Sequence, residues 1–226
     1  MSATLSATFL APSALPEELP IFPLAGVVLL PRARLPLNVF EQRYLTMVED
    51  ALASPGRMIG MIQPNTHEHN DDPVPPIYKI GCAGRIVSFS EAENNRFLIS
   101  LSGVCRFEVA EELPRDKLYR RVRPDWSRFH NDLAMPKPVD IPRQQMMKVL
   151  HDYFHQQNID TDWKIIEKTP DELLISSLTM ICPFAPNERQ ALLEATDLEA
   201  RAKMLTALLE MGLLPQGGEG ESGARH

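Results

Sequence analysis

Features that mark membrane, secreted and metal-binding proteins are scarce in this sequence of 226 residues. Its three cysteines, Cys82, Cys105 and Cys182, are odd in number and widely spaced, which argues against a disulfide framework and against a zinc site built on cysteine pairs. No apolar run approaches the roughly 20 residues that span a bilayer. The sequence therefore predicts no membrane contact, and its cysteines are expected to be small core residues.

Motifs of catalysis are also missing. The sequence has no G-x-x-x-x-G-K-[ST] phosphate-binding loop, no G-x-S-x-G nucleophile elbow, and no histidine close to Cys105 in sequence that would activate its thiol. We therefore expect a protein that is not an enzyme, with no catalytic residue, no metal and no cofactor.

The charge balance of the chain is acidic, with a net charge of -7 and an isoelectric point near 5.4. Such a protein attracts phosphate backbones and anionic membranes only weakly. Residues 1–16 are rich in Ala, Ser, Thr and Pro and contain no basic residue, which predicts a disordered leader rather than a signal peptide. Residues 214–226 predict a disordered tail. We expect a cytoplasmic protein.

The segment from Leu19 to Ala53 is where we expect the fold to be anchored. It begins with three short apolar runs, residues 21–24, 27–30 and 35–37, which are interrupted by prolines and are too short for helices. Because proline cannot donate to a sheet ladder, these runs predict edge or bulged strands.

An amphipathic helix is expected to follow these runs. Asn38 would cap it, with Glu41 three residues later completing a capping-box arrangement, and residues 54–56 (Ser-Pro-Gly) would stop it. Its apolar face is predicted to carry Phe40, Tyr44, Met47, Val48, Ala51 and Leu52.

Short strands are predicted through the rest of the first half. A compact apolar run at 57–63 predicts a buried strand, and a polar, proline-rich surface loop follows at 65–76. Further strands are expected at 77–89, 96–101, 104–109 and 119–122. Asn94 and Asn95 are the expected turn of a hairpin. Many short strands around one inserted helix predict a small, partly closed β-barrel over residues 17–125.

The second half of the chain has helical patterns, so the predicted fold class is α+β. Residues 126–141 are polar and proline-rich and predict a linker, and residues 142–213 predict a helical bundle. Helices are expected to begin near Asp140, at the capping box Thr169-Pro170-Asp171-Glu172, at Asn187 and at Asp197. Gly212 would end the last helix. The stripe of that helix carries Leu198, Arg201, Ala202, Leu205, Leu208 and Leu209.

Several short motifs of this sequence, in their order and spacing, resemble those of the substrate-binding N-terminal domain of the ATP-dependent protease Lon. They are L-P-I-F-P-L, V-V-L-L-P, L-P-L-N-V-F-E and R-Y in the anchoring segment, then I-Y-K-I-G-C-A-G-R-I and L-S-G-V-C-R-F. Near the C-terminus, E-R-Q-A-L-L-E-A-T-D-L-E-A-R-A resembles the end of the helical bundle of that family. The resemblance implies a PUA-like barrel followed by this bundle, without the ATPase and peptidase modules of a complete Lon.

Two histidine groups have ligand-like spacing. His67 and His69 stand near Asp71 and Asp72 in a polar loop, and His151 and His155 are four residues apart on one helical face. The loop group is interpreted as solvated. The helical pair lacks a third ligand of obvious spacing, so its members are interpreted as surface or boundary residues.

Basic and aromatic residues alternate between residues 115 and 129. This mixture is what single-stranded nucleic acid binding needs, because bases stack on rings while cations neutralise the backbone. The alternative function is therefore an RNA-binding module that uses Arg120, Arg121, Arg123, Trp126 and Arg128. The simpler interpretation, which the acidic charge of the chain favours, is that Arg120, Arg121 and Arg123 pair with acidic helices.

The leading hypothesis is a stand-alone, non-catalytic protein that recognises polypeptide. Its partners would be client proteins with unfolded or exposed segments, and it would act as an adaptor in proteolysis or quality control. The sequence leaves open whether an ATP-dependent protease is a second partner. An apolar groove or an open strand edge would bind the polypeptide. The candidate binding residues are Phe22, Leu24, Val28, Leu30, Leu35 and Leu37.

Overall fold

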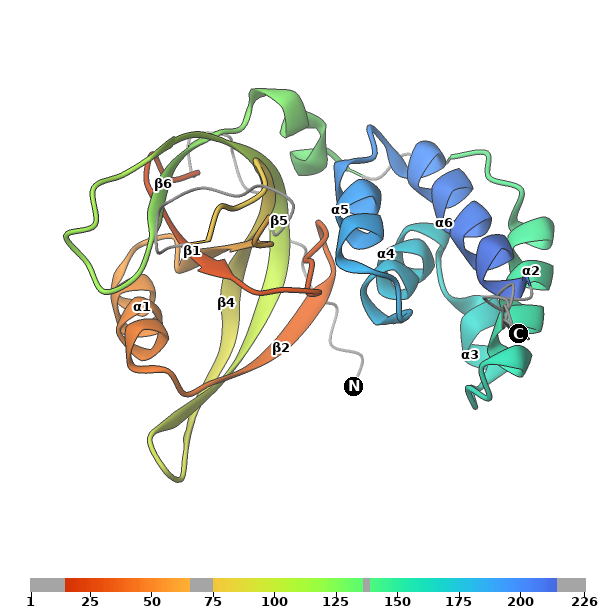
Figure 1. Ribbon diagram of the computed structural model, residues 1–226, viewed down its shortest axis with the longest axis horizontal. Coiled ribbons are helices and arrows are strands. Elements are labelled where there is room, and N and C mark those ends of the chain that lie inside the picture. The colour runs from red at the N-terminus through yellow and green to blue at the C-terminus, as the bar shows by residue number, and fades with distance from the viewer. Residues whose placement is uncertain (1–14, 66–74, 136–138, 215–226) are drawn as a thin grey trace, which may run out of the picture.

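The computed structural model describes residues 15–65, 75–135 and 139–214. The strands are β1 (Leu19–Pro23), β2 (Arg34–Val39), β3 (Met58–Ile62), β4 (Ile80–Ala92), β5 (Arg96–Glu112) and β6 (Arg121–Asp125). The helices are α1 (Gln42–Ala53), the 3-10 helix η2 (Ser127–Leu133), α2 (Arg143–Gln156), α3 (Trp163–Lys168), α4 (Asp171–Ile181), α5 (Pro186–Glu194) and α6 (Leu198–Leu213). The strands and α1 lie on one side of the molecule and α2–α6 on the other, which confirms the α+β class (Figure 1).

The six strands of the described residues belong to one sheet with the order β2-β5-β4-β3-β1-β6. β6 pairs with β5 as well as with β1, so the far end of this order connects back to β5. β2 pairs with β5 and with no second strand of the described residues. The strands therefore form a strongly curved sheet with β2 at an open edge.

β4 and β5 form a long hairpin that extends beyond the rest of the sheet (Figure 1). Its turn contains Asn94 and Asn95, whose φ angles of 63° and 54° confirm the predicted turn. β5 is one strand of 17 residues, where the sequence predicted two. Gly103 does not break it: a Cβ there would lie 1.9 Å from the carbonyl oxygen of Leu30, so glycine allows the chain before β2 to cross β5 closely.

The apolar run at 27–30 is buried but is not a strand, so that prediction was wrong. Val28, Leu29 and Leu30 are each at most 2% exposed. Arg32 then adopts a φ of 64°, and its N–H donates to the carbonyl oxygen of Gly103 at 2.8 Å. The run is apolar because it covers the core as a loop, and burial alone does not require a ladder partner.

The helix α1 begins later than its capping pattern predicted. Its N-terminal flanking residue is Glu41, and Asn38 lies within β2, where it pairs with Leu98. The ladder with β5 keeps the chain extended up to Val39, which overrides the local capping preference. Phe40 is therefore outside the helix and is 61% exposed, contrary to prediction.

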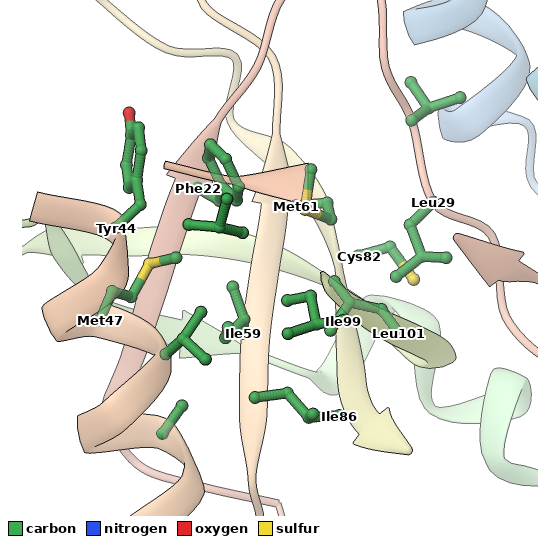
Figure 2. Close-up of a cluster of buried hydrophobic side chains, with 14 of the residues drawn as sticks. Phe22, Leu29, Tyr44, Met47, Ile59, Met61, Cys82, Ile86, Ile99 and Leu101 are labelled. Atoms are coloured by element: carbon green, nitrogen blue, oxygen red, sulfur yellow. The ribbon is translucent and has the colours of Figure 1, made fainter. Parts of the chain in front are cut away.

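The main core lies between α1 and the sheet. Figure 2 shows Met47 of α1 pointing towards the buried side chains of the strands, among them Ile59, and Tyr44 beside the Phe22 ring. Tyr44, Met47, Val48 and Ala51 are buried, as the amphipathic pattern predicted. A smaller cluster surrounds Phe107, which is fully buried.

The helices α2, α4, α5 and α6 pack around a second core. Asp197 caps α6 as predicted, because its carboxylate accepts a hydrogen bond from the Ala200 N–H at 2.8 Å. Thr169 does not cap α4; its hydroxyl donates to the carbonyl oxygen of Ile165 at 2.8 Å. Gly212 lies inside α6, where a Cβ would come within 2.6 Å of the Tyr153 ring, so its role is close packing and not termination.

The segment 126–141, for which the sequence predicts a linker, contains η2. Its Phe129 and Asp132 are buried, since η2 packs on β5 at the junction with the helices. Among the described residues, no helix is long and apolar enough to cross a membrane. The PUA-like designation stays a prediction.

Candidate functional site

The six residues predicted to bind polypeptide do not form one accessible groove. Phe22, Val28 and Leu30 are at most 7% exposed, and the Phe22 ring packs on Tyr44 with 4.1 Å between ring centroids. These three side chains belong to the main core. A ligand cannot contact them in this conformation.

The other three candidates, Leu24, Leu35 and Leu37, are partly buried against the same core. Leu35 and Leu37 lie on β2, opposite Leu101 and Ile99 of β5. For polypeptide binding, the backbone of these residues is more relevant than their side chains. The edge of β2 that faces away from β5 has no strand partner within the described ranges. An open strand edge can pair with an extended polypeptide.

Exposed apolar side chains lie on β4, on β5 and just after β2. Phe40 is 61% exposed, Leu98 45%, Val87 44% and Phe89 39%. Phe40 and Leu98 come together where the β2–β5 ladder ends, and we refer to these two residues as the hairpin patch. Sequence reasoning missed it, because Phe40 was assigned to a buried helix face and the alternating pattern of β5 does not show which face stays open.

The strand register places Phe40 and Leu98 on the same face of the sheet. Val39 pairs with Phe97, and the Arg96 guanidinium lies over the Phe40 ring, 5.5 Å from its centroid. Alternate residues of a strand share a face, so Phe40, Arg96 and Leu98 stand together on one face of the sheet, where β2 pairs with β5. Phe89 belongs to the opposite face, where its ring meets the edge of Phe97 at 5.1 Å.

The cysteines do not offer a nucleophile. All three are buried, and burial raises the pKa of Cys105 to about 12 and that of Cys182 to about 11. Burial likewise raises the pKa of the Cys82 thiol well above its usual value. At neutral pH the thiols are therefore protonated and poorly reactive.

Of the two histidine groups with ligand-like spacing, the structure describes only the pair on α2. His67 and His69, with Asp71 and Asp72, lie outside the described residues. The His151 ring packs on Trp163, with 4.8 Å between centroids, and is largely exposed. Over the parts of the chain that are described, no three histidine, cysteine or carboxylate side chains come together to hold a metal ion.

The arginines of the predicted RNA site are paired with carboxylates. Arg120 contacts Glu112 at 2.7 Å, and Arg121 contacts Glu18 at 2.8 Å. The remaining pairs are Arg121 with Asp116, Arg123 with Glu111, and Arg128 with Glu108. The prediction that these arginines pair with acids is confirmed, but the acids belong to β5 and to loops and not to helices, because β6 lies beside β5 in the sheet.

Trp126, the aromatic member of that site, is also engaged within the protein. Its indole N–H donates to the carbonyl oxygen of Pro16 at 3.3 Å, and its ring meets the edge of Phe107 at 5.8 Å between centroids. These contacts hold the ring against the smaller core cluster, so it does not form a free platform on which a base could stack.

A buried polar cluster joins the sheet to the helices. Arg106 of β5 donates from Nε and Nη2 to the two carboxylate oxygens of Asp132, each at 2.8 Å, and from Nη1 to the carbonyl oxygens of Leu193 and Ala195 at the end of α5. Arg106 is 4% exposed and Asp132 9%. Bidentate pairing and two helix-end carbonyls satisfy this buried guanidinium.

Two glutamines make a second junction contact. Gln63 is fully buried and donates to the carbonyl oxygen of Pro186 at 2.9 Å and to the Gln190 side chain at 3.1 Å. Gln190 in turn donates to the carbonyl oxygen of Ile80 at 3.0 Å. Sequence reasoning missed both clusters; an arginine within the apolar stripe of the last helix, Arg201, was the one pattern that indicated a buried charge.

The comparisons with known proteins agree with the arrangement of sheet and helices. Residues 18–211 match the family model of the "ATP-dependent protease La (LON) substrate-binding domain". The Lon protease of Dictyoglomus thermophilum is 30% identical over 208 residues, which are 86% of this chain and 24% of that protein. The human peroxisomal Lon protease homolog 2 is 25% identical over 216 residues, 88% of this chain and 25% of that protein.

Solved structures show the same fold. The Lon N-terminal domain protein of Xanthomonas campestris has a TM-score of 0.55 at 26% identity, and the comparison covers 84% of this chain and 97% of that one. The N-terminal domain of a Mycobacterium avium complex Lon protease has a TM-score of 0.60 at 13% identity, with 85% and 98% covered.

These matches define a class of substrate-binding domains. This chain belongs to the Lon substrate-binding domain family. It spans about a quarter of the length of the curated Lon proteases it matches, and the matched part is their substrate-binding domain.

Proposed function

We propose that this protein is a non-catalytic polypeptide-recognition unit, which binds unfolded or exposed segments of client proteins beside β2. Membership in a substrate-binding family supports polypeptide as the ligand class. The observation that carries the location is the open edge of β2, with exposed Phe40 at the end of this strand and exposed Leu98 on the same face of the neighbouring β5. The sheet is proposed to be a PUA-like barrel, supported by the pairing of β6 with both β1 and β5. The cytoplasmic location stays a prediction.

The geometry suits an extended segment. A client strand that pairs with β2 gains main-chain hydrogen bonds independent of its sequence, and its alternate side chains then lie on the face of the sheet that carries Phe40 and, across β2, Leu98. Pro36 in the middle of β2 lacks an N–H, which limits the length of continuous pairing. We therefore expect short segments with apolar residues at alternate positions to bind best.

Binding can be tested with a permanently unfolded model polypeptide and its folded counterpart. Isothermal titration calorimetry should show tighter binding of the unfolded form, and hydrogen exchange should show protection of the backbone between residues 34 and 40 only when that form is present. Equal affinity for both forms, or protection confined to another part of the molecule, would contradict the proposal.

Charge substitutions in the hairpin patch sharpen the test. Phe40→Asp and Leu98→Asp should each weaken polypeptide binding at least tenfold, because the carboxylate must be desolvated against an apolar segment. Leu118→Asp is the matched control, since Leu118 is 66% exposed, lies in the loop before β6 and should not affect binding. If all three variants bind like the original protein, the patch is not the site.

A role as an adaptor can be tested by measuring the degradation of a client protein. A client bound here should be degraded faster by an ATP-dependent Lon-type protease when this protein is added, and Phe40→Asp should abolish that acceleration. An acceleration that survives Phe40→Asp would separate the adaptor role from this surface, and no acceleration would leave polypeptide recognition without a link to proteolysis.

A further inference from the structure

A cavity of about 290 Å³ lies at the junction of the sheet and the helices, apart from the hairpin patch. Its walls come from the chain before β2, from β5 and η2, and from the start of α6. Its charged lining residues are four arginines, Arg32, Arg106, Arg128 and Arg201, and three carboxylates, Asp132, Glu172 and Asp197. Arg128 is paired with Glu108, a carboxylate outside the lining.

Each of the three lining carboxylates already has a hydrogen-bond or ion-pair partner within the protein. Asp132 accepts hydrogen bonds from the Arg106 side chain at 2.8 Å and from the Arg106 backbone N–H at 3.0 Å. Glu172 pairs with Arg32. Asp197 caps α6 through the Ala200 N–H. Arg32, Arg106 and Arg128 each have a carboxylate partner, so among the described residues one lining arginine has none of its own.

Arg201 is that arginine. Its side chain is in the apolar stripe of α6 and is 5% exposed. Its Nε donates to the carbonyl oxygen of Leu192 at 2.8 Å, but its Nη2 is buried and, in the described part of the chain, has no hydrogen-bond partner. Burial, and next the positive charge of Arg106, lower the pKa of Arg201 to about 10, so the guanidinium is still charged at neutral pH.

We propose that this cavity binds a small oxyanion, either a phosphate or a carboxylate group, beside the Arg201 guanidinium. An unpaired buried charge is unfavourable, and an anion supplies both the missing charge and acceptors for the free N–H groups. The planar guanidinium fork matches phosphate and carboxylate oxygens. The volume is near the lower end of small-molecule pockets, roughly 300 Å³, which restricts the ligand to a small anion.

The ligand would connect both halves of the molecule. Arg106 belongs to β5, Asp132 to η2 and Arg201 to α6, so an anion held among them is sensitive to how the helices sit on the sheet. Because the ligand binds only the folded state, its saturation should raise the unfolding temperature. Polypeptide binding at the hairpin patch does not require this site, and each proposal can fail alone.

The first test titrates the protein with inorganic phosphate by isothermal titration calorimetry, with sodium chloride used to keep the ionic strength constant. We expect saturable binding with one site per chain, accompanied by a higher unfolding temperature. A parallel titration with acetate distinguishes a carboxylate site from a phosphate site. No saturable heat with either anion would overturn the proposal.

Variants assign the binding to this cavity. Arg201→Gln should weaken binding of the preferred anion at least tenfold, whereas Arg123→Gln, which removes the same charge from the surface, should leave it within a factor of two. Leu198→Trp fills the cavity without changing its charge and should also weaken binding at least tenfold, so it decides the question if Arg201→Gln does not fold. Equal affinity in Leu198→Trp and the original protein would mean an adventitious anion elsewhere and would refute the site.

Discussion

The arginines beside β6 and the arginines at the junction of sheet and helices make similar bonds in different surroundings. Arg123 and Glu111 have side chains that are 55% and 56% exposed, so water screens their pairing. Arg106 and Asp132 are 4% and 9% exposed. An exposed pair contributes little to stability, whereas removing one partner of a buried pair leaves an unpaired charge inside the protein.

The difference shows how a sequence pattern can direct attention to the wrong charges. Residues 115–129 stand out because their basic and aromatic residues are close together in the chain. Arg106, Asp132 and Arg201 are separated by 26 residues or more and do not form a motif. Folding brings them together, and their burial makes them the more consequential group.

The largest expected effect comes from breaking the buried pair. Arg106→Met should lower the free energy of unfolding by about 3–5 kcal/mol, because Asp132 is left buried without its partner. Urea denaturation measures the change. The double variant Arg106→Met with Asp132→Leu should recover part of the loss, since neither member of the pair then leaves its partner's charge behind. A loss below 1 kcal/mol in the single variant would remove the distinction between the two groups.

The glutamine contact tests whether neutral junction groups behave like the charged ones. Gln190→Leu should destabilise the protein by about 1–3 kcal/mol, because the Ile80 carbonyl and the Gln63 side chain lose a buried partner. The matched control is Gln145→Leu, which alters an exposed glutamine of α2 and should change the stability by less than about 0.5 kcal/mol. Equal effects of the two substitutions would show that junction burial is not the cause.

The cap of α6 is exposed to solvent and is expected to have an intermediate effect. Asp197→Ala should destabilise by about 1 kcal/mol near pH 7, because the Ala200 N–H loses its acceptor. That hydrogen bond lowers the pKa of Asp197 from 3.8, so the ionised cap favours folding above the unfolded pKa.

The same cap gives a pH dependence. Since the folded pKa is the lower one, the stability difference between Asp197→Ala and the original protein should be constant above about pH 5 and should shrink as the pH falls below 3.8. Urea denaturation at a series of pH values measures this. A difference that persists unchanged at low pH would mean that the ionised carboxylate is not the cap.

The smallest effect is expected at the surface arginine. Arg123→Met should change the free energy of unfolding by no more than about 0.5 kcal/mol, and added salt should reduce even this difference, because both charges of the pair are screened. Urea denaturation at low and high salt provides the measurement. A loss comparable to that of Arg106→Met would show that exposure does not separate the two groups.

Several elements could be predicted because local patterns determine them. The buried face of α1, the turn at Asn94 and Asn95, and the Asp197 cap follow from periodicity, from the tolerance of asparagine for positive φ, and from side-chain capping. The order of the Lon-like motifs indicated the family for the same reason, because this order is defined by positions in the chain and not by distances in space.

Other features depended on contacts between distant residues. The apolar run at 27–30 and the strands have similar composition, but only the packing of the chain decides that this run covers the core without pairing. The ladder with β5 extends β2 past Asn38 and leaves Phe40 outside the helix. Gly103 and Gly212 resemble chain breakers in the sequence, yet each is required by a close neighbour, Leu30 or Tyr153.

The sequence by itself determined the mixed fold class, the family and most helix and strand positions, because these depend on short-range periodicity and on the order of short motifs along the chain. The tertiary structure alone decided which apolar residues remain exposed and which charges are buried. Phe40 and Leu98 became neighbours through the register of β2 with β5, and Arg201 was left without a carboxylate because Asp132 is occupied by Arg106. Exposure and charge pairing are properties of the packed chain, and no local pattern contains them.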